Sequence, residues 1–510
     1  MVRVFSSSMR SLLTCLATGL CTSIMAQAYF SKTYGHGPFQ GGAVTPSGGL
    51  ILNTDNGLRT TDAEGVPIWS RDYLNFGVND FQIYDTTSYW AIFKDVAPLG
   101  TAGYVAVGRA LPSVTTYRTN QALVGVFDTS GTPLWAGTHG GVLVEEYTFA
   151  NAEATGTALI GGWDEGLANV SGLMARVGAT YAGNYSASAY CTAAGMFTFI
   201  LDGVPLANGD ALFGGCGVNG AVVMRSPPGM STSWCRSYAL PDALNYTGVK
   251  LAEAPDGSLY AAAGPLSQGF ALLRMDASGN ALWSHEYTMS VTGTPTGIAV
   301  RPNGKVLVTG TTWMMQCDSL GAIDWARQYD GHWIRSLETV PGADEHYLVG
   351  STFSDLGWVM RPDTSGLVLG CSISNLSASY TVINPVISTN CSNAPNAFGP
   401  GDEHHHFAQG AGSSSSVECF STGTGSIPDH IGIGVHPNPA NGMFYLRCDV
   451  PITAGDDVEL RDLHGRLVRT LRGFGSYEIS IVRGDLPAGI YSIRVLQNGS
   501  NWLSARVVLE

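Results

Sequence analysis

The sequence predicts an all-β protein, a seven-bladed β-propeller followed by a small immunoglobulin-like β-sandwich. Three observations carry this prediction. A short turn-and-strand motif recurs through residues 29–371, which indicates a repeat fold. The chain holds 65 glycines and only 13% charged residues, which suits short strands joined by tight turns. Residues 430–510 carry short alternating strands of their own, so the 510-residue chain divides into domains.

Residues 1–28 have the pattern of a signal peptide. Arg3 and Arg10 give a positive start, residues 12–25 are apolar, and Ala-Gln-Ala at 26–28 is a small-x-small cleavage site. The apolar run is shorter than the ~20 residues that a membrane span needs, which makes a transmembrane anchor the weaker interpretation. No later stretch could cross a membrane. We therefore expect an exported mature chain without a membrane span.

Charge and cysteine content limit the partners further. Nucleic-acid binding needs a cationic face, so the net charge of −14 argues against it. Two of the ten cysteines lie in the signal peptide, and an exported chain can oxidise the rest. Their wide spacing indicates a few disulfides whose pairing stays open. No Cys-x-x-Cys occurs, so neither a zinc motif nor a redox motif is expected.

The repeated motif is Asp-x-x-Gly-x-x-x-Trp, usually followed four residues later by Tyr. The aspartate caps the backbone of a turn, and the glycine takes positive φ. The two aromatic residues lie on one face of the next strand, because side chains alternate along a strand. The clear copies are Asp62, Gly65 and Trp69; Asp128, Gly131 and Trp135; Asp276, Gly279 and Trp283; and Asp318, Gly321 and Trp325.

Shorter strands precede each motif. Residues 297–300 lead into a Pro-Asn-Gly turn at 302–304, and the stretches 305–310 and 311–318 follow. Together with the motif this makes four short strands in about 34 residues, the pattern of a propeller blade.

The last copy of the motif is incomplete. Asp363 and Gly366 form its turn, but no Trp or Tyr follows. Residues 30–34, with Phe30 and Tyr34, have the aromatic-x-x-x-Tyr pattern but no blade before them. We therefore expect this N-terminal strand to complete the last blade. Such closure removes two exposed strand edges and brings the count to seven.

These blades resemble the quinoprotein-like propeller group over residues 29–371. The resemblance implies the fold. Members that use a quinone cofactor have eight blades and an adjacent Cys-Cys pair, and this sequence has neither. We therefore expect no cofactor.

Residues 372–429 are rich in Ser, Gly and Asn and predict a linker. His404, His405 and His406 follow two acidic residues there. Imidazole and carboxylate suit zinc or nickel, which makes these histidines the weak metal candidates of the chain. The alternative is a solvated loop, because adjacent histidines cannot easily all face one ion.

Three short motifs mark residues 430–510: Pro-Asn-Pro-x-x-Gly, Asp-x-x-Gly-Arg and Leu-x-x-Gly-Ile-Tyr. The strands between them alternate as in a small β-sandwich. The motif residues are Pro437, Asn438, Pro439, Gly442, Asp462, Gly465, Arg466, Gly489 and Tyr491.

In this order and near the chain end, the motifs resemble the type A C-terminal sorting domain of the bacterial type IX secretion system. The resemblance implies a Bacteroidota-type bacterium. It also implies contact with the outer-membrane secretion machinery, removal by a surface sortase, and a secreted or outer-surface location. An ordinary immunoglobulin-like adhesion module is the alternative.

Several acidic residues could serve catalysis or metal binding. Two carboxylates facing across a cleft about 5–10 Å wide would suit a glycosidase. A metal is the other option for Asp344-Glu345-His346, and solvated strand ends are the plain alternative for all of them. The carboxylate candidates are Asp80, Glu145, Glu146, Asp164 and Glu165.

An insertion at residues 74–100 is rich in aromatic residues. Such side chains can stack on sugars or proteins, or they can pin the insertion to the propeller. They are Phe76, Phe81, Tyr84, Tyr89, Trp90 and Phe93.

The sequence therefore favours an exported bacterial protein whose propeller is a binding or structural module, with a carbohydrate or a protein as its ligand. It assigns no catalytic or cofactor-binding residues and leaves enzyme activity open, with the balance against it. The alternative is a secreted hydrolase or lyase that acts on polysaccharide or peptide.

Overall fold

The computed structural model shows an all-β chain that divides into two compact units, Met1–Thr424 and Gly425–Glu510. Among the residues that it describes, no helix is long and apolar enough to cross a membrane. These are residues 29–509 without 36, 79–87, 113–120, 140–143, 166–169, 181–184, 190–198, 218–219, 241–242, 267–268, 292, 369, 390–404, 410–414, 422–432, 437–438, 454–455, 463–465, 473–475 and 498–499.

The strands of the first unit follow one another in antiparallel sets of four. The first three sets are β2 (Gly41–Val44), β3 (Leu50–Asn53), β4 (Gly57–Thr61) and β5 (Pro67–Val78); β6 (Ser88–Pro98), β7 (Tyr104–Pro112), β8 (Gln121–Phe127) and β9 (Pro133–His139); and β10 (Glu145–Ala152), β11 (Ala158–Glu165), β12 (Val170–Val177) and β13 (Tyr185–Ala189).

The next sets repeat this order, and the last one takes its fourth strand from the N-terminus. They are β14 (Phe199–Pro205), β15 (Ala211–Gly217), β16 (Gly220–Ser226) and β17 (Trp234–Ala239); β18 (Ala243–Glu253), β19 (Leu259–Leu266), β20 (Gly269–Met275) and β21 (Ala281–Met289); β22 (Pro295–Val300), β23 (Val306–Gly310), β24 (Trp313–Cys317) and β25 (Ile323–Tyr329); and β26 (His332–Thr339), β27 (His346–Thr352), β28 (Gly357–Arg361) and β1 (Tyr29–Tyr34).

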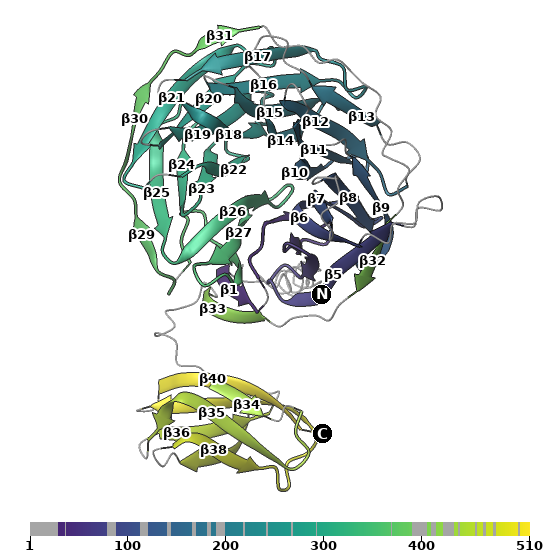
Figure 1. Ribbon diagram of the computed structural model, residues 1–510. Helices are drawn as coiled ribbons and strands as arrows, with labels where there is room; N and C mark the ends of the chain where they lie inside the picture. Colours follow the sequence, from purple (N-terminus) through teal and green to yellow (C-terminus); the bar gives the residue numbers. More distant parts are fainter. Residues whose placement is uncertain are drawn as a thin grey trace, which may run out of the picture. The chain divides into compact units, whose positions relative to one another are not determined.

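The sets stand around a ring with the first strand of each set innermost (Figure 1). These inner strands touch in the cyclic order β2, β6, β10, β14, β18, β22, β26 and back to β2. The propeller prediction is therefore confirmed. Because β5 also pairs with β6, the first two sets form one continuous sheet, and the count of seven separate blades stays a prediction from the repeat.

The repeated motif joins each blade to the next. In the turn after β20, Asp276 Oδ1 accepts hydrogen bonds from the amides of Ser278 and Asn280, at 2.8 and 2.9 Å. On β21, Trp283 Nε1 donates to a carbonyl in the next blade's turn, at 3.1 Å, and Tyr287 Oη donates to the Gly321 carbonyl there, at 2.6 Å. The aromatic pair therefore fastens neighbouring blades together, besides filling the core.

The motif glycine has two reasons to lack a side chain. Gly279 has a φ of +78°, which disfavours residues with a Cβ. A Cβ there would also lie 2.8 Å from the ring of Trp234, which belongs to the preceding blade. The tryptophan of the preceding blade thus packs against the glycine of the Asp-x-x-Gly turn.

The N-terminal strand lies where the sequence predicts it. β1 pairs antiparallel with β28, from Phe30 opposite Arg361 to Tyr34 opposite Gly357. Tyr34 Oη donates to the Gly65 carbonyl at 2.7 Å, so this strand makes the same inter-blade bond as the other motif tyrosines.

Where a linker was expected at residues 372–429, the described residues instead add strands to the outside of the ring. We call these strands the belt (Figure 1). They join the blades in reverse chain order: β29 (Ile373–Asn375) pairs with β25, β30 (Ala378–Val382) with β21, β31 (Val386–Ser388) with β17, β32 (His405–Gln409) with β5, and β33 (Ser415–Ser421) with β1.

The belt follows from the N-terminal closure. β1 occupies the edge of β28 where the blade's own fourth strand would lie, so the chain leaving β28 meets the free edge of β25 instead. The amino-acid composition did not predict these strands, because they pair with the blades mainly through backbone hydrogen bonds. β30, for example, leaves most of its side chains exposed.

Two cysteines of the first unit, Cys235 and Cys371, are disulfide-bonded, in line with an exported chain. Cys317 is a free thiol in the core, where burial raises its pKa to about 12.

The second unit is a β-sandwich with an apolar core that includes Phe444, Leu460 and Ile493. One sheet holds β34 (Ile433–His436), β35 (Met443–Ile452) and β38 (Ser476–Val482); the other holds β37 (Leu467–Arg472), β36 (Asp456–Arg461), β39 (Gly489–Gln497) and β40 (Ser500–Leu509).

Candidate functional site

The two faces of the propeller differ in how their strands are connected. One face, which we call the turn face, carries the Asp-x-x-Gly turns and the turns that follow the inner strands, such as 254–258 and 301–305. The opposite face, which we call the loop face, carries the connections between blades. These vary in length from 330–331 to 190–198. Variable loops on a regular scaffold are where binding residues usually lie.

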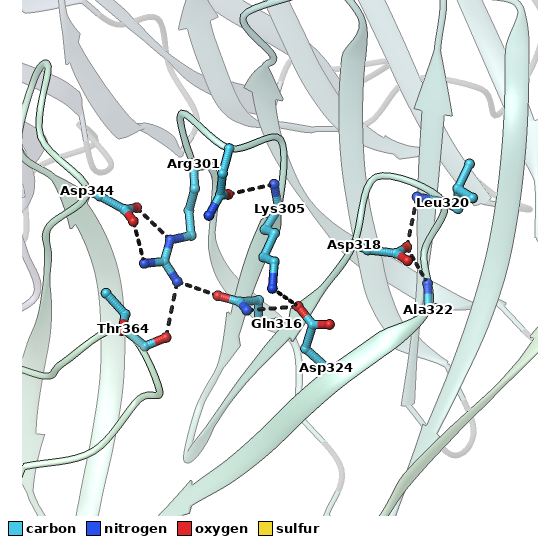
Figure 2. A network of polar contacts seen from close by, with 10 residues as sticks. Arg301, Lys305, Gln316, Asp318, Leu320, Ala322, Asp324, Asp344 and Thr364 are labelled. Atoms are coloured by element: carbon cyan, nitrogen blue, oxygen red, sulfur yellow. Dashed lines mark hydrogen bonds and ion pairs between the residues drawn. The ribbon is translucent and has the colours of Figure 1, made fainter.

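Polar groups on the turn face are used to hold blades together. The Arg301 guanidinium binds both carboxylate oxygens of Asp344 in the next blade, at 2.6 and 2.7 Å (Figure 2). It also donates to Gln316 Oε1 and to the Thr364 carbonyl. Gln316 in turn donates to Asp324, which pairs with Lys305 at 3.0 Å. The network spans two blades and leaves few donors for a ligand.

Two carboxylates on the inner strands also hold neighbouring blades together. Asp95 Oδ2 accepts a hydrogen bond from the Ala150 amide on the next inner strand, at 2.9 Å. Asp202 Oδ2 accepts one from the Leu251 amide, at 2.8 Å. Each carboxylate thus satisfies a backbone donor on the free edge of a neighbouring inner strand. The sequence held no signal for this role, because the bonds join separate blades.

A third inner-strand carboxyl, Glu338, belongs to the same electrostatic cluster. Burial, followed by the charge of Asp95, raises the pKa of Glu338 to about 8. Burial also raises the pKa of Asp95 to about 7. Lys250 Nζ lies 3.7 Å from Asp202 and partly offsets these negative charges. Burial thus raises the pKa values of Asp95 and Glu338, while backbone amides fix Asp95 and Asp202.

The predicted glycosidase carboxylates that the structure describes lie on two paired neighbouring strands, β10 and β11. Glu145 stands directly opposite Asp164 on the neighbouring strand, and Glu146 stands opposite Trp163. Glu146 faces cations instead, with Lys94 Nζ at 3.3 Å. Glu165 ends β11, and Asp80 lies outside the described residues.

The residues predicted as metal candidates have other roles or positions in the structure. Asp344 is held by Arg301 as described above, Glu345 pairs with Arg361, and His346 is buried with a pKa lowered by burial to about 4. His405 and His406 begin β32, and His404 lies outside the described residues. No metal-binding group of His, Cys, Asp and Glu occurs in the described part of the chain.

The aromatic insertion forms the long facing ends of β5 and β6. Phe76 on β5 pairs through its backbone with Tyr89 on β6. Phe93 is fully buried in the core, which fits the interpretation that it pins the insertion down. Phe81 and Tyr84 lie outside the described residues, and Trp90 lies on β6.

Two further aromatic pairs lie on the loop face, and sequence analysis did not single them out. Trp163 and Phe199 meet edge to face, with ring centroids 5.2 Å apart. Trp333 and Phe353 meet at 5.5 Å in the last blade. Phe199 and Trp333 occupy the same place on their inner strands, two residues before a β-bulge. No signal marks the bulges in the sequence, so the equivalence emerges only from strand register.

The motif residues of the second unit are turn formers. Asp462 Oδ1 accepts from the Arg466 amide at 3.0 Å, and Arg466 Nε returns a bond to Asp462 Oδ2 at 2.7 Å. Tyr491 Oη donates to the Pro487 carbonyl at 2.9 Å, two residues before Gly489. Pro439 and Gly442 border the short bridge at Ala440, whereas Pro437, Asn438 and Gly465 lie outside the described residues.

Arg483, which sequence analysis missed, connects the first and third of these motifs. Its amide donates to the Gly442 carbonyl at 2.6 Å, and its Nε donates to the Leu486 carbonyl at 2.9 Å. Two motifs that are far apart in the sequence therefore form one corner of the sandwich.

Comparison with known proteins assigns this second unit. Residues 434–510 match the family described as secretion system C-terminal sorting domains. This is the sorting domain of the type IX secretion system that the motifs predicted. The protein is therefore exported to the cell surface or the medium. Curated protein sequences give no match.

Solved structures offer distant likenesses. The chain is similar to a protein of unknown function from Bacteroides caccae, with 10% identity over 66% of this chain and 91% of that one, at a TM-score of 0.32. A gluconolactonase from Xanthomonas campestris shows 14% identity over 57% and 89%, at 0.30. The extracellular domain of a hybrid two-component system from B. thetaiotaomicron shows 10% over 92% and 67%, at 0.30.

Proposed function

We propose that this protein is a surface-delivered binding propeller that recognises its ligand with the loop face. In this proposal residues 1–28 are a signal peptide, residues 29–371 form the propeller, and residues 430–510 are recognised by the secretion machinery of a Bacteroidota-type bacterium. A surface sortase then removes the sorting domain.

The difference between the two faces is the observation that carries the proposal. Turn-face groups such as Arg301 and Asp344 bind one another across blades. The loop face combines variable connections with two aromatic pairs, Trp163–Phe199 and Trp333–Phe353. Aromatic rings on a rigid scaffold suit a sugar or a protein surface at low entropic cost.

Binding and turnover are tested together on the mature chain, residues 29–510. Soluble glycans and insoluble polysaccharides serve as probes. We expect saturable binding to at least one of them without new reducing ends. Release of reducing ends would instead support a secreted hydrolase or lyase, and a chain that binds no glycan would refute a carbohydrate ligand.

A further inference from the structure

Arg335 is an exposed cation that lies over the Trp333 ring and has no ionic partner among the described residues. It lies in the β-bulge of β26, where the pairing shifts between Ile334 and Ser336. Its side chain is exposed, and its guanidinium lies 5.7 Å from the centroid of the Trp333 ring. No carboxylate of the described residues forms an ion pair with it.

One other blade, that of β6, places a cation at the corresponding position. Lys94 is the corresponding bulge residue of β6, where the pairing shifts between Phe93 and Asp95. Its Nζ reaches Glu146 at the start of the next inner strand, at 3.3 Å. In the blade after Arg335, the buried Phe39 and the half-buried Gln40 come just before the inner strand, and Gln40 donates to Asp55 Oδ1 at 2.9 Å. Arg335 therefore lacks the acid that neutralises its counterpart.

The aromatic pair beside Arg335 forms a fixed platform. Trp333 is 38% exposed and Phe353 is 57% exposed, although both stand on well-bonded backbone. The Phe353 amide donates to the Gly331 carbonyl at 2.8 Å, and the turn closes through Asp355 at a φ of 59°. Large apolar side chains held outward in this way stay available to a ligand.

We propose that Trp333, Phe353 and Arg335 bind a sugar ring that carries a carboxylate, as in a uronate-containing polysaccharide. The apolar face of a pyranose can stack on the aromatic rings, and a guanidinium binds a carboxylate through two parallel hydrogen bonds. The net charge of −14 does not prevent binding of an anionic sugar. Charges beyond the Debye length of about 8 Å are screened at physiological salt. The inference rests on the proposed binding function and names the class of its ligand.

The test measures binding of the mature chain to tetragalacturonate, with neutral tetragalactose as the reference probe. We expect Arg335→Gln to weaken tetragalacturonate binding at least tenfold and to leave the neutral probe unchanged. Trp333→Ala should weaken binding of both probes. Arg71→Gln is the matched control, because Arg71 stacks on Trp69 in the same manner at 5.9 Å but on an outer strand.

Unchanged tetragalacturonate affinity in Arg335→Gln, or the same loss in Arg71→Gln, would overturn the inference. Poly-glutamate binding as tight as that of the uronate would overturn it too and point to an acidic polypeptide. If the wild-type chain binds other glycans but no uronate, only this inference fails. If it binds no glycan of any kind, the carbohydrate ligand of the proposed function fails with it.

Discussion

At the residue scale, the repeat motif serves blade-to-blade bonding as much as turn formation. The sequence indicates that Asp276 caps a turn and that Trp283 and Tyr287 share a strand face. It does not indicate that both aromatic side chains donate to the turn of the following blade. That role depends on the spacing between blades, which only the closed ring defines.

Glu338 provides a test at the same scale. Its pKa of about 8 in the folded protein lies above the ordinary value of 4.5, so the folded state binds more protons than the unfolded state between these pH values. Stability is therefore full below about pH 4.5 and falls as the pH rises toward 8. We expect Glu338→Gln to raise the free energy of unfolding at pH 9 by about 1 kcal/mol, after a discount for solvent access, and to change little at pH 4.

Thermal unfolding of both chains from pH 4 to pH 9 measures this difference. The exposed Glu64 supplies the control substitution Glu64→Gln, which should leave the pH profile as it is. A Glu338→Gln profile parallel to that of the wild type would show that the Glu338 carboxyl ionises without cost to the fold.

At the element scale, the two ends of the propeller chain meet in one sheet. β1 lies between β28 and β33, so the first described strand of the chain is held on both edges. β33 ends at Ser421, just before the second unit begins. The strand that closes the ring is therefore paired with a segment that the composition assigns to a linker.

Deletions test this arrangement. Removal of residues 29–34 should lower the melting temperature sharply, because the last blade loses its fourth strand and β33 loses its partner.

A chain that ends at residue 412 lacks β33 and should have a lower melting temperature than a chain that ends at residue 424. Differential scanning calorimetry of these variants gives the order. Equal melting temperatures for the 412 and 424 chains would refute a stabilising role for β33.

At the scale of the whole molecule, the proposed function assigns export and ligand binding to separate compact units. Their separation agrees with an address that other proteins must read and that the propeller does not need for folding. The sorting motifs are explained by turns within the second unit, so their loss should damage that unit alone.

Truncation after residue 430 should therefore give a folded propeller that stays in the periplasm of its native host. A reporter fused to residues 430–510 behind a signal peptide should reach the surface and lose the domain on arrival. Cell fractionation and mass spectrometry of the new C-terminus measure both outcomes. Normal amounts of the truncated chain in the medium would mean that the sorting domain is dispensable for export.

The sequence by itself determined the all-β class, the repeat, the N-terminal closure and the C-terminal sorting domain. Each of these is written in local patterns: the Asp-x-x-Gly turn, the aromatic spacing and the three sorting motifs need only neighbouring residues. Such patterns can be recognised in the sequence without knowing which residues pack against them in the fold.

Tertiary structure alone decided the belt, the acids of the inner strands and the environment of Arg335. The belt strands pair through backbone atoms, which every residue supplies, so their side chains hold no signal. Asp95 and Asp202 link neighbouring blades because each accepts a hydrogen bond from a backbone amide on the next inner strand. Arg335 has no ion-pair partner among the residues that the structure describes, whereas Lys94 at the corresponding place pairs with Glu146. All three depend on which blade stands beside which, and only ring closure sets that order.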